Sequence, residues 1–127
     1  MSKILIVDDE PMIRLLLREI LEELEDIGVE LIAADNGEDA IETIKNEKPE
    51  LIFLDVMMPK MNGFEVCNIV KNELGLKHIR IIMLTAKGQK FDKQKAKESG
   101  VDFYITKPFN PDDIFAKAVE ILGINVS

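Results

Sequence analysis

The chain has 127 residues, of which 46% are hydrophobic and 31% charged, and its formal net charge is −8. This length and composition predict one globular domain, residues 1–127, with a buried core. The acidic balance makes it a poor binder of nucleic acid, whose phosphates must be neutralised by lysine and arginine. With Cys67 as the single cysteine, no apolar run long enough for a membrane and no signal-peptide pattern, we expect a cytoplasmic protein.

Short apolar runs alternate with helical patterns along the whole chain. A short run that can bury both of its faces is typical of a central strand in a parallel sheet. In chain order the patterns predict strand 3–8, helix 11–25, strand 29–34, helix 37–46, strand 51–55, helix 63–73, strand 79–84, helix 90–99, strand 103–106 and helix 111–122. Strand and helix alternate five times, which predicts an α/β fold with a doubly wound, five-stranded parallel sheet and helices on both faces.

The predicted helices differ in how clearly the sequence marks them. Asn36 and Asn110 stand just before two helices, where their side chains can accept hydrogen bonds from free backbone N–H groups. The helix 90–99 is the least clearly marked, because Phe91 and Ala96 are its only clear apolar residues. We therefore expect this helix to be exposed and comparatively mobile.

Acidic residues follow two of the predicted strands directly. The run 4–7 is followed by Asp8 and Asp9, and the run 51–54 by Asp55. Ligands of open parallel α/β sheets bind outside the carboxyl ends of the strands. Carboxylates at these positions are therefore placed for chemistry.

If the first and third strands are neighbours, these carboxylates meet and need a cation. Two of them about 4 Å apart repel by roughly 4 kcal/mol at an effective dielectric near 20. Mg²⁺ suits such oxygen ligands, together with waters and a phosphate, which suggests phosphoryl transfer to an aspartate. Lys107, which ends the run 103–106, can neutralise phosphoryl oxygens, and Thr85, at the end of the fourth strand, can donate a hydroxyl hydrogen bond.

A set of short motifs stands in order at the predicted strand ends: Asp8-Asp9, then Asp55 with Val56-Met57-Met58-Pro59-Lys60-Met61-Asn62-Gly63, then Thr85-Ala86, then Lys107-Pro108-Phe109. Each motif is weak alone, but the ordered set resembles the receiver domain of two-component response regulators. The resemblance covers essentially the whole chain. It implies a flavodoxin-like (βα)5 fold with strand order 2-1-3-4-5, in which the first and third strands lie side by side.

The same resemblance implies a role for each acidic position. Asp55 would accept a phosphoryl group from a histidine kinase or a histidine phosphotransfer protein. Asp9 and Asp55 would bind Mg²⁺ through their side chains, Met57 through its backbone carbonyl, and Asp8 directly or through water. The protein would then be a switch that changes partner affinity or oligomeric state, and not a turnover enzyme.

The resemblance also assigns the phosphate-sensing positions. Thr85 and Lys107 would hold the phosphoryl oxygens, and the Lys107–Pro108 peptide bond would be cis. Tyr104 matches the family's switch aromatic, which turns inward when the threonine moves, although a plain strand residue on a half-exposed face has similar weight. The family's usual output surface corresponds to about 90–122 here, which would bind an output partner or a second copy of the chain.

Several residues near these motifs have simpler readings. Met58 is expected to pack into the core, because no cysteine or histidine surrounds it as a soft-metal site would require. His78 is expected to be an exposed loop residue, and Cys67 to pack as a small hydrophobe. Met57 cannot orient an attacking water, so our hypothesis is slow loss of the phosphoryl group.

Three other functions compete with the switch. A haloacid-dehalogenase-type phosphohydrolase needs a second carboxylate two residues after the nucleophile, where this chain has Met57. A flavoprotein needs a Ser/Thr/Gly-rich phosphate loop after the first strand, where residues 8–11 read Asp-Asp-Glu-Pro. A dimerisation module that works without phosphorylation stays open. Four residues follow Gly123, so we expect no output domain within this sequence, and both a stand-alone receiver and one excised from a longer regulator stay open.

Overall fold

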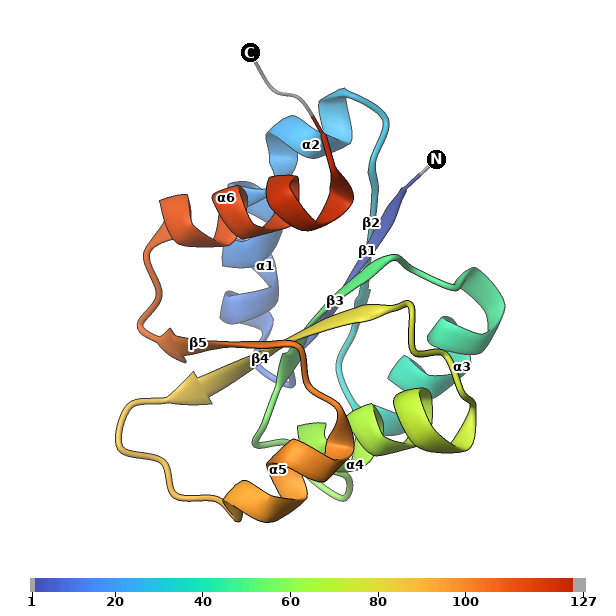
Figure 1. Ribbon diagram of the computed structural model, residues 1–127. Coiled ribbons are helices and arrows are strands. Elements are labelled where there is room, and N and C mark those ends of the chain that lie inside the picture. The colour runs from blue at the N-terminus through green and yellow to red at the C-terminus, as the bar shows by residue number, and fades with distance from the viewer. Residues whose placement is uncertain (1, 125–127) are drawn as a thin grey trace.

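A five-stranded parallel sheet forms the centre of the computed structural model, which describes residues 2–124 (Figure 1). The strand order is β2-β1-β3-β4-β5, as the resemblance implied, with β1 and β3 side by side. Each apolar run became one strand. The three central strands are buried on both sides of the sheet over most of their length, whereas the two edge strands also carry exposed residues. The strands are β1 Lys3–Val7, β2 Glu30–Ala34, β3 Leu51–Asp55, β4 Arg80–Ala86 and β5 Phe103–Lys107.

Helices cover both faces of this sheet, as predicted. Helices α1 and α6 pack together on one face with α2, while α3 and α4 lie on the other face and α5 packs beside α4 (Figure 1). Their bounds are α1 Pro11–Ile20, α2 Glu22–Asp26, α3 Gly37–Glu47, α4 Gly63–Asn68, α5 Lys93–Ser99 and α6 Pro111–Leu122. A π-helix, Ile69–Glu73, continues α4 directly. None of the helices within residues 2–124 combines the length and apolar character needed to cross a bilayer.

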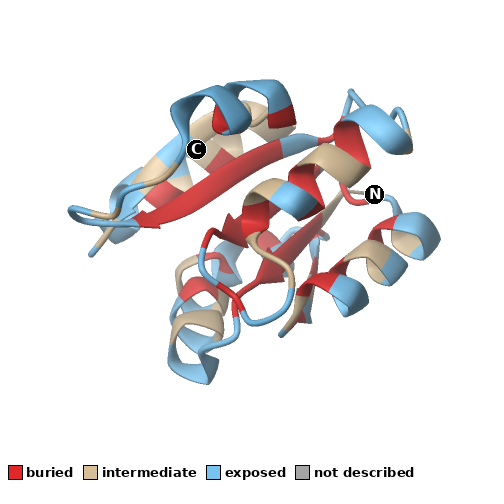
Figure 2. Cartoon of the chain, turned by 90° about the horizontal axis from the view of Figure 1, so that it is seen from below, coloured by how far each residue is buried: buried red, intermediate tan, exposed pale blue. Residues whose placement is uncertain are grey.

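Side chains of alternate residues in the central strands point into two separate hydrophobic cores, one on each face of the sheet. Leu5 and Leu54 point into the core under α3 and α4, whereas Ile6 and Phe53 point into the core under α1 and α6. Figure 2 shows the buried residues along the strands and on the helix sides that face them, with exposed residues outside. Burial on both faces fixes the register of β1 and β3, and therefore fixes what stands at their carboxyl ends.

The first predicted helix, 11–25, is wrong in one respect, because it is interrupted at Leu21. Leu21 leaves helical geometry with φ −95° and ψ 4°, and α2 begins at Glu22. Leu17, Leu21 and Leu24 are all fully buried in the same core. The apolar spacing therefore continues across the interruption, and periodicity alone gives no signal of it.

The helix predicted at 90–99 is also partly wrong. It begins at Lys93, because the Asp92 carboxylate accepts hydrogen bonds from the backbone N–H groups of Gln94 and Lys95, at 2.9 and 3.2 Å. Its inner side is buried through Ala96 and Ser99, although its other residues are exposed as predicted. The expected mobility of this helix stays a prediction.

The remaining local predictions are confirmed. The Asn36 and Asn110 side chains accept hydrogen bonds from the N–H groups of Asp39 and Asp112, at 2.8 and 2.9 Å. Met58 and Cys67 are buried and His78 is exposed.

Candidate functional site

Two predicted site residues meet at the carboxyl edge of the sheet. Asp8 follows the last residue of β1, and Asp55 is the last residue of β3. Because Val7 and Leu54 are register partners in these paired strands, the two aspartates emerge next to one another. Both are buried, which is unusual for carboxyl groups unless they are paired.

Lys107, on the edge strand β5, supplies the cation that pairs with these two carboxylates. It is the last residue of β5, and its ammonium reaches past β4 to Asp8 Oδ2 at 3.0 Å and to Asp55 Oδ1 at 3.2 Å. Burial works against the charged form of Lys107, but the hydrogen bonds and charges of the two aspartates outweigh it and raise its pKa. The Lys107–Pro108 peptide bond is cis, as the resemblance implied.

The pKa of Asp55 is raised to about 6. Burial is the largest cause, followed by the negative charge of Asp8, while the charge and hydrogen bond of Lys107 and the backbone N–H of Met57 act in the opposite direction. Asp55 is therefore a carboxylate at neutral pH, but one that would gain from a further cation.

The loop after β1 gathers more oxygen ligands than the sequence predicted. Carboxylate oxygens of Asp8, Asp9 and Glu10 lie within 4.8 Å of one another, and Asp9 and Glu10 are exposed. The Glu10 N–H donates to Asp8 Oδ1 at 2.9 Å, and Arg14 donates to the Asp8 carbonyl at 2.7 Å, which holds the loop in place. All three ligands are oxygens, so the set fits a hard cation such as Mg²⁺. Glu10 was not among the predicted ligands, although its place beside two aspartates was an available signal.

The loop after β3 is packed tightly around Asp55. The Gly63 N–H donates to the Val56 carbonyl at 2.9 Å, and a Cβ atom on Gly63 would lie 2.4 Å from the Asp55 carbonyl oxygen. The Met57 side chain points outward and is 65% exposed. The backbone of this loop is thus placed next to Asp55, while the predicted use of the Met57 carbonyl as a ligand stays a prediction.

Among the described residues, neither Thr85 nor Tyr104 forms a hydrogen bond to the carboxylates of the site. Thr85 is buried, and its hydroxyl lies 3.4 Å from that of Thr106 on β5. Tyr104 is 45% exposed and stacks on Phe91, with ring centroids 6.0 Å apart and planes 8° apart. The predicted switch role of Thr85 and Tyr104 stays a prediction.

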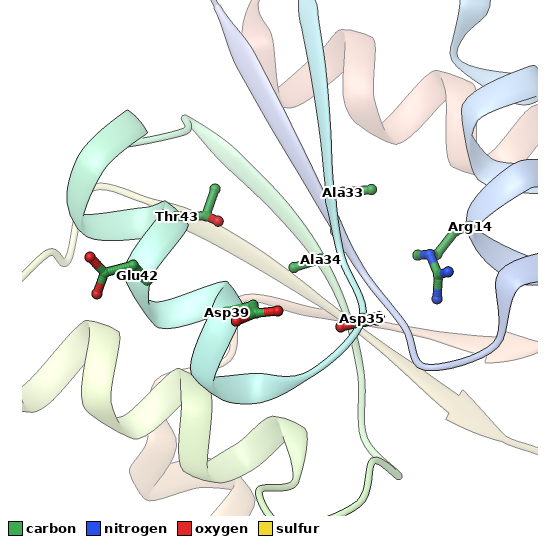
Figure 3. Close-up of a pocket in the computed structure, with 7 residues that line it drawn as sticks. All are labelled: Arg14, Ala33, Ala34, Asp35, Asp39, Glu42 and Thr43. Carbon is green, nitrogen blue, oxygen red and sulfur yellow. The ribbon is translucent and has the colours of Figure 1, made fainter.

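Two depressions flank this edge of the sheet. One of about 290 Å³ includes Asp9, Asp35 and Lys60 in its lining. The other, of about 440 Å³, lies over the edge strand β2, with Arg14 on one side and the α3 residues Asp39, Glu42 and Thr43 on the other (Figure 3). Asp35 follows β2 directly, so the strand-end rule that identified Asp8 and Asp55 was a signal for it too.

Comparison with known proteins matches this geometry to one family. The family model for the response regulator receiver domain matches residues 4–119. The chain is 45% identical over 121 residues to the alkaline phosphatase synthesis transcriptional regulatory protein PhoP of Bacillus subtilis, covering 95% of this chain and 48% of PhoP. It is 36% identical over 112 residues to protein PilG of Pseudomonas aeruginosa, covering 88% of this chain and 81% of PilG. The crystal structure of chemotaxis protein CheY4 of Vibrio cholerae superposes with a TM-score of 0.81 at 32% identity, covering 95% of this chain and 98% of that one.

The fold is thus that of a CheY-like signalling domain, and the chain belongs to the response regulator receiver family. Receiver domains act as switches in two-component signalling, between histidine kinases and output domains. The chain spans about half the length of PhoP but most of the length of PilG. The relatives therefore include both longer regulators and regulators of about this length.

Proposed function

We propose that residues 1–127 form one receiver domain that accepts a phosphoryl group on Asp55 from a histidine kinase or a histidine phosphotransfer protein. The observation that carries this proposal is the ammonium of Lys107, which reaches both Asp8 and Asp55 at the carboxyl edge of the sheet. The reaction makes the domain a switch that changes its affinity for a partner or its oligomeric state, and not a turnover enzyme.

Asp55 is suited to act as the nucleophile. Its pKa of about 6 leaves a carboxylate at neutral pH, next to a cation that can neutralise charge. An Asp55 oxygen forms a bond to phosphorus as the phosphorus–nitrogen bond of phosphohistidine breaks, and the departing nitrogen keeps the electron pair. Lys107 is placed to hold an equatorial oxygen during this step and in the product.

Asp8, Asp9 and Asp55 would hold Mg²⁺ together with the Met57 carbonyl, and water and the phosphoryl group would complete its ligands. Glu10, whose carboxylate lies with those of Asp8 and Asp9, can support the set. When bound, the ion supplies charge neutralisation between the carboxylates and the transferred phosphoryl group. Before the ion binds, Asp8 orients the Lys107 ammonium through their 3.0 Å ion pair.

Thr85 and Tyr104 would convert phosphorylation into a conformational change. Within residues 2–124 the Thr85 hydroxyl has only the long 3.4 Å contact to Thr106 to lose, so a phosphoryl oxygen can attract it at little cost. Movement of Thr85 would open space beside Tyr104, which is then free to turn inward from its exposed position. A ligand shifts a conformational equilibrium only through such contacts that differ between the two states.

Two surfaces are available to partners. Helix α1 leaves Met12, Leu15 and Leu16 exposed beside the Asp8 loop, an apolar stripe that a phosphodonor could cover. The output partner, or a second copy, would bind the face made by about 90–122, which includes the exposed ring of Tyr104. We place this exchange in the cytoplasm, where histidine kinases present their phosphohistidine.

Beryllofluoride, which mimics a phosphoryl group on aspartate, tests the proposal when it is titrated with Mg²⁺ into the wild-type protein and the Asp55→Ala variant. Tyr104 is the single tyrosine and the chain has no tryptophan, so tyrosine fluorescence reports on the switch position alone. We expect a saturable change for the wild type and none for the variant. A wild type that responds no more than Asp55→Ala would refute the proposal.

A further inference from the structure

The loop after β4 is closed by a reciprocal pair of hydrogen bonds. The Ala86 N–H donates to the side-chain oxygen Oε1 of Gln89 at 2.8 Å, and the Gln89 N–H donates to the Ala86 carbonyl at 3.0 Å. Ala86 is the last residue of β4 and follows Thr85 directly. The Gln89 side chain therefore accepts a hydrogen bond from a backbone N–H at the same edge of the sheet as Asp55, the proposed phosphoacceptor.

The direction of the Ala86 N–H follows from the sheet. The Val56 N–H donates to the Leu84 carbonyl at 3.2 Å, so the backbone groups of Leu84 face β3. Backbone groups of alternate strand residues point to the same side, so the Ala86 N–H also faces β3. Asp55 is the register partner of Leu84 on β3. The Ala86 N–H, two residues after Leu84, therefore points toward the loop that follows Asp55.

The Gln89 amide is held at only one of its two ends. Its nitrogen, Nε2, is buried without a hydrogen-bond partner within the part of the chain that the structure describes. A buried amide donor without a partner is unfavourable, so the hydrogen bond from Ala86 to Gln89 Oε1 is offset by the unsatisfied N–H groups of Nε2. Such a side chain is more easily displaced by a charged acceptor than one bonded at both ends.

We propose that Gln89 is a placeholder for a phosphoryl oxygen: its Oε1 occupies the Ala86 N–H in the unphosphorylated state and leaves it when Asp55 carries a phosphoryl group. Gln89 is then a positioning residue that lowers the affinity of the site for the phosphoryl group. This inference rests on the proposed function, because it names the regulation of that same site.

The same displacement connects the site to the surface. Gln89 lies two residues before Phe91, whose ring stacks on Tyr104 and also lies 5.0 Å from the ring of Phe64. Gln89, Phe64 and Phe91 line one depression of about 560 Å³ between α4 and this loop. Release of Gln89 frees the loop that holds Phe91, and the stack that keeps Tyr104 outward is weakened with it.

The test titrates Mg²⁺ and beryllofluoride into the wild type, Gln89→Ala and Gln89→Met, with tyrosine fluorescence as the readout. Gln89→Met keeps most of the side-chain volume without the acceptor, so it separates loss of the hydrogen bond from loss of packing. We expect both variants to bind beryllofluoride about fivefold more tightly, the gain from removing one competing net hydrogen bond. Gln94→Ala is the matched control, because the Gln94 side chain is exposed on α5 and donates to the Glu98 carboxylate at 2.9 Å.

Hydrogen exchange of the Ala86 amide, followed by NMR without beryllofluoride, supplies an independent readout. We expect faster exchange in both Gln89 variants than in the wild type and in Gln94→Ala. Unchanged or weaker beryllofluoride binding by the Gln89 variants, or unchanged exchange of the Ala86 amide, would overturn the placeholder role. A wild type that fails to respond to beryllofluoride would instead refute the proposed function, so the two failures are distinguishable.

Discussion

The ammonium of Lys107 lies 3.2 Å from the carboxylate of Asp55, although a whole strand, β4, separates β5 from β3. The same ammonium lies 3.0 Å from Asp8, so one lysine neutralises part of the charge on two buried carboxylates. Its position has two consequences. Lys107 holds the pKa of Asp55 below the value that burial and Asp8 alone would give, and it competes with any metal ion for the same oxygens.

Lys107→Met should therefore bind Mg²⁺ more tightly and respond less to beryllofluoride. Removing the competing ammonium leaves Asp8 and Asp55 to the metal, and a gain of about fivefold corresponds to about 1 kcal/mol of partly buried ion pairing. The phosphoryl mimic loses a cationic partner in the same variant. Calorimetric titration at pH 8, where Asp55 is ionised, measures both effects. Lys117→Met, which removes an ammonium paired with Glu120, is the control, and equal Mg²⁺ affinity in the two variants would contradict the competition.

Asp55→Asn should stabilise the metal-free protein at pH 8. Because the pKa of Asp55 is raised to about 6 in the folded state, folding binds protons between the unfolded pKa near 4 and pH 6. The stability contributed by Asp55 is thus present at low pH and is lost as pH rises through about 6. The neutral asparagine avoids this loss, and we expect a gain of about 1–2 kcal/mol at pH 8, after allowing for solvent screening.

Urea unfolding with a chelator present checks both the sign and the pH dependence of this gain. The difference between Asp55→Asn and the wild type should shrink toward pH 5, where most of Asp55 is protonated. The exposed Glu19, changed to Gln, should have little effect at either pH. A gain that is independent of pH would point to packing and not to the ionisation of Asp55.

The sequence was sufficient to locate Asp8, Asp55 and Lys107, and the reason is geometric. Short apolar runs that alternate with helical patterns are typical of the strands of a parallel sheet, and parallel strands bring their carboxyl ends to one edge. The position of a residue in such a run therefore predicts its place in the fold. The strand order still came from the resemblance, because no local pattern states which strands are neighbours.

Side-chain partners and helix interruptions could not be predicted in the same way. The pairing of Thr85 with Thr106 and of Gln89 with Ala86 depends on rotamers chosen by surrounding contacts. The interruption at Leu21 likewise has no signal in the apolar spacing, which continues through it. Such features depend on contacts between several elements, which periodicity and capping residues do not report.

Gly63→Ala should destabilise the protein by about 2 kcal/mol or more. The new Cβ would lie 2.4 Å from the Asp55 carbonyl oxygen and 2.7 Å from the Met83 sulfur, and the backbone cannot give way without moving Asp55. Gly75→Ala is the control, because Gly75 has φ +68° with open space around it and should cost only about 1 kcal/mol of backbone strain. Urea unfolding compares the two, and a Gly63 variant no less stable than the Gly75 variant would contradict the close approach.

The buried ion pair of Lys71 with Asp102 leads to the last prediction. The Lys71 side chain is 5% exposed, and its ammonium lies 2.9 Å from the Asp102 carboxylate, which also accepts the Ile81 N–H at 2.8 Å. Asp102→Ala leaves the Ile81 N–H without this acceptor and the Lys71 ammonium without its counter-charge, although that ammonium still donates to the Lys77 carbonyl at 3.2 Å. Because the Asp102 side chain is 22% exposed, we expect a loss of about 2–3 kcal/mol. Asp102 precedes β5 at the end opposite Lys107, which separates this effect from the phosphoryl site.

The pair can be tested against its own double replacement. Lys71→Met combined with Asp102→Asn removes both charges and keeps an acceptor for the Ile81 N–H, so it should recover most of the stability lost by Asp102→Ala. The surface pair Lys117–Glu120 should contribute less than about 1 kcal/mol in the same double-mutant comparison. If the double replacement unfolds as easily as Asp102→Ala, the loss comes from the hydrogen bond to Ile81 or from packing, and the unpaired ammonium is not its cause.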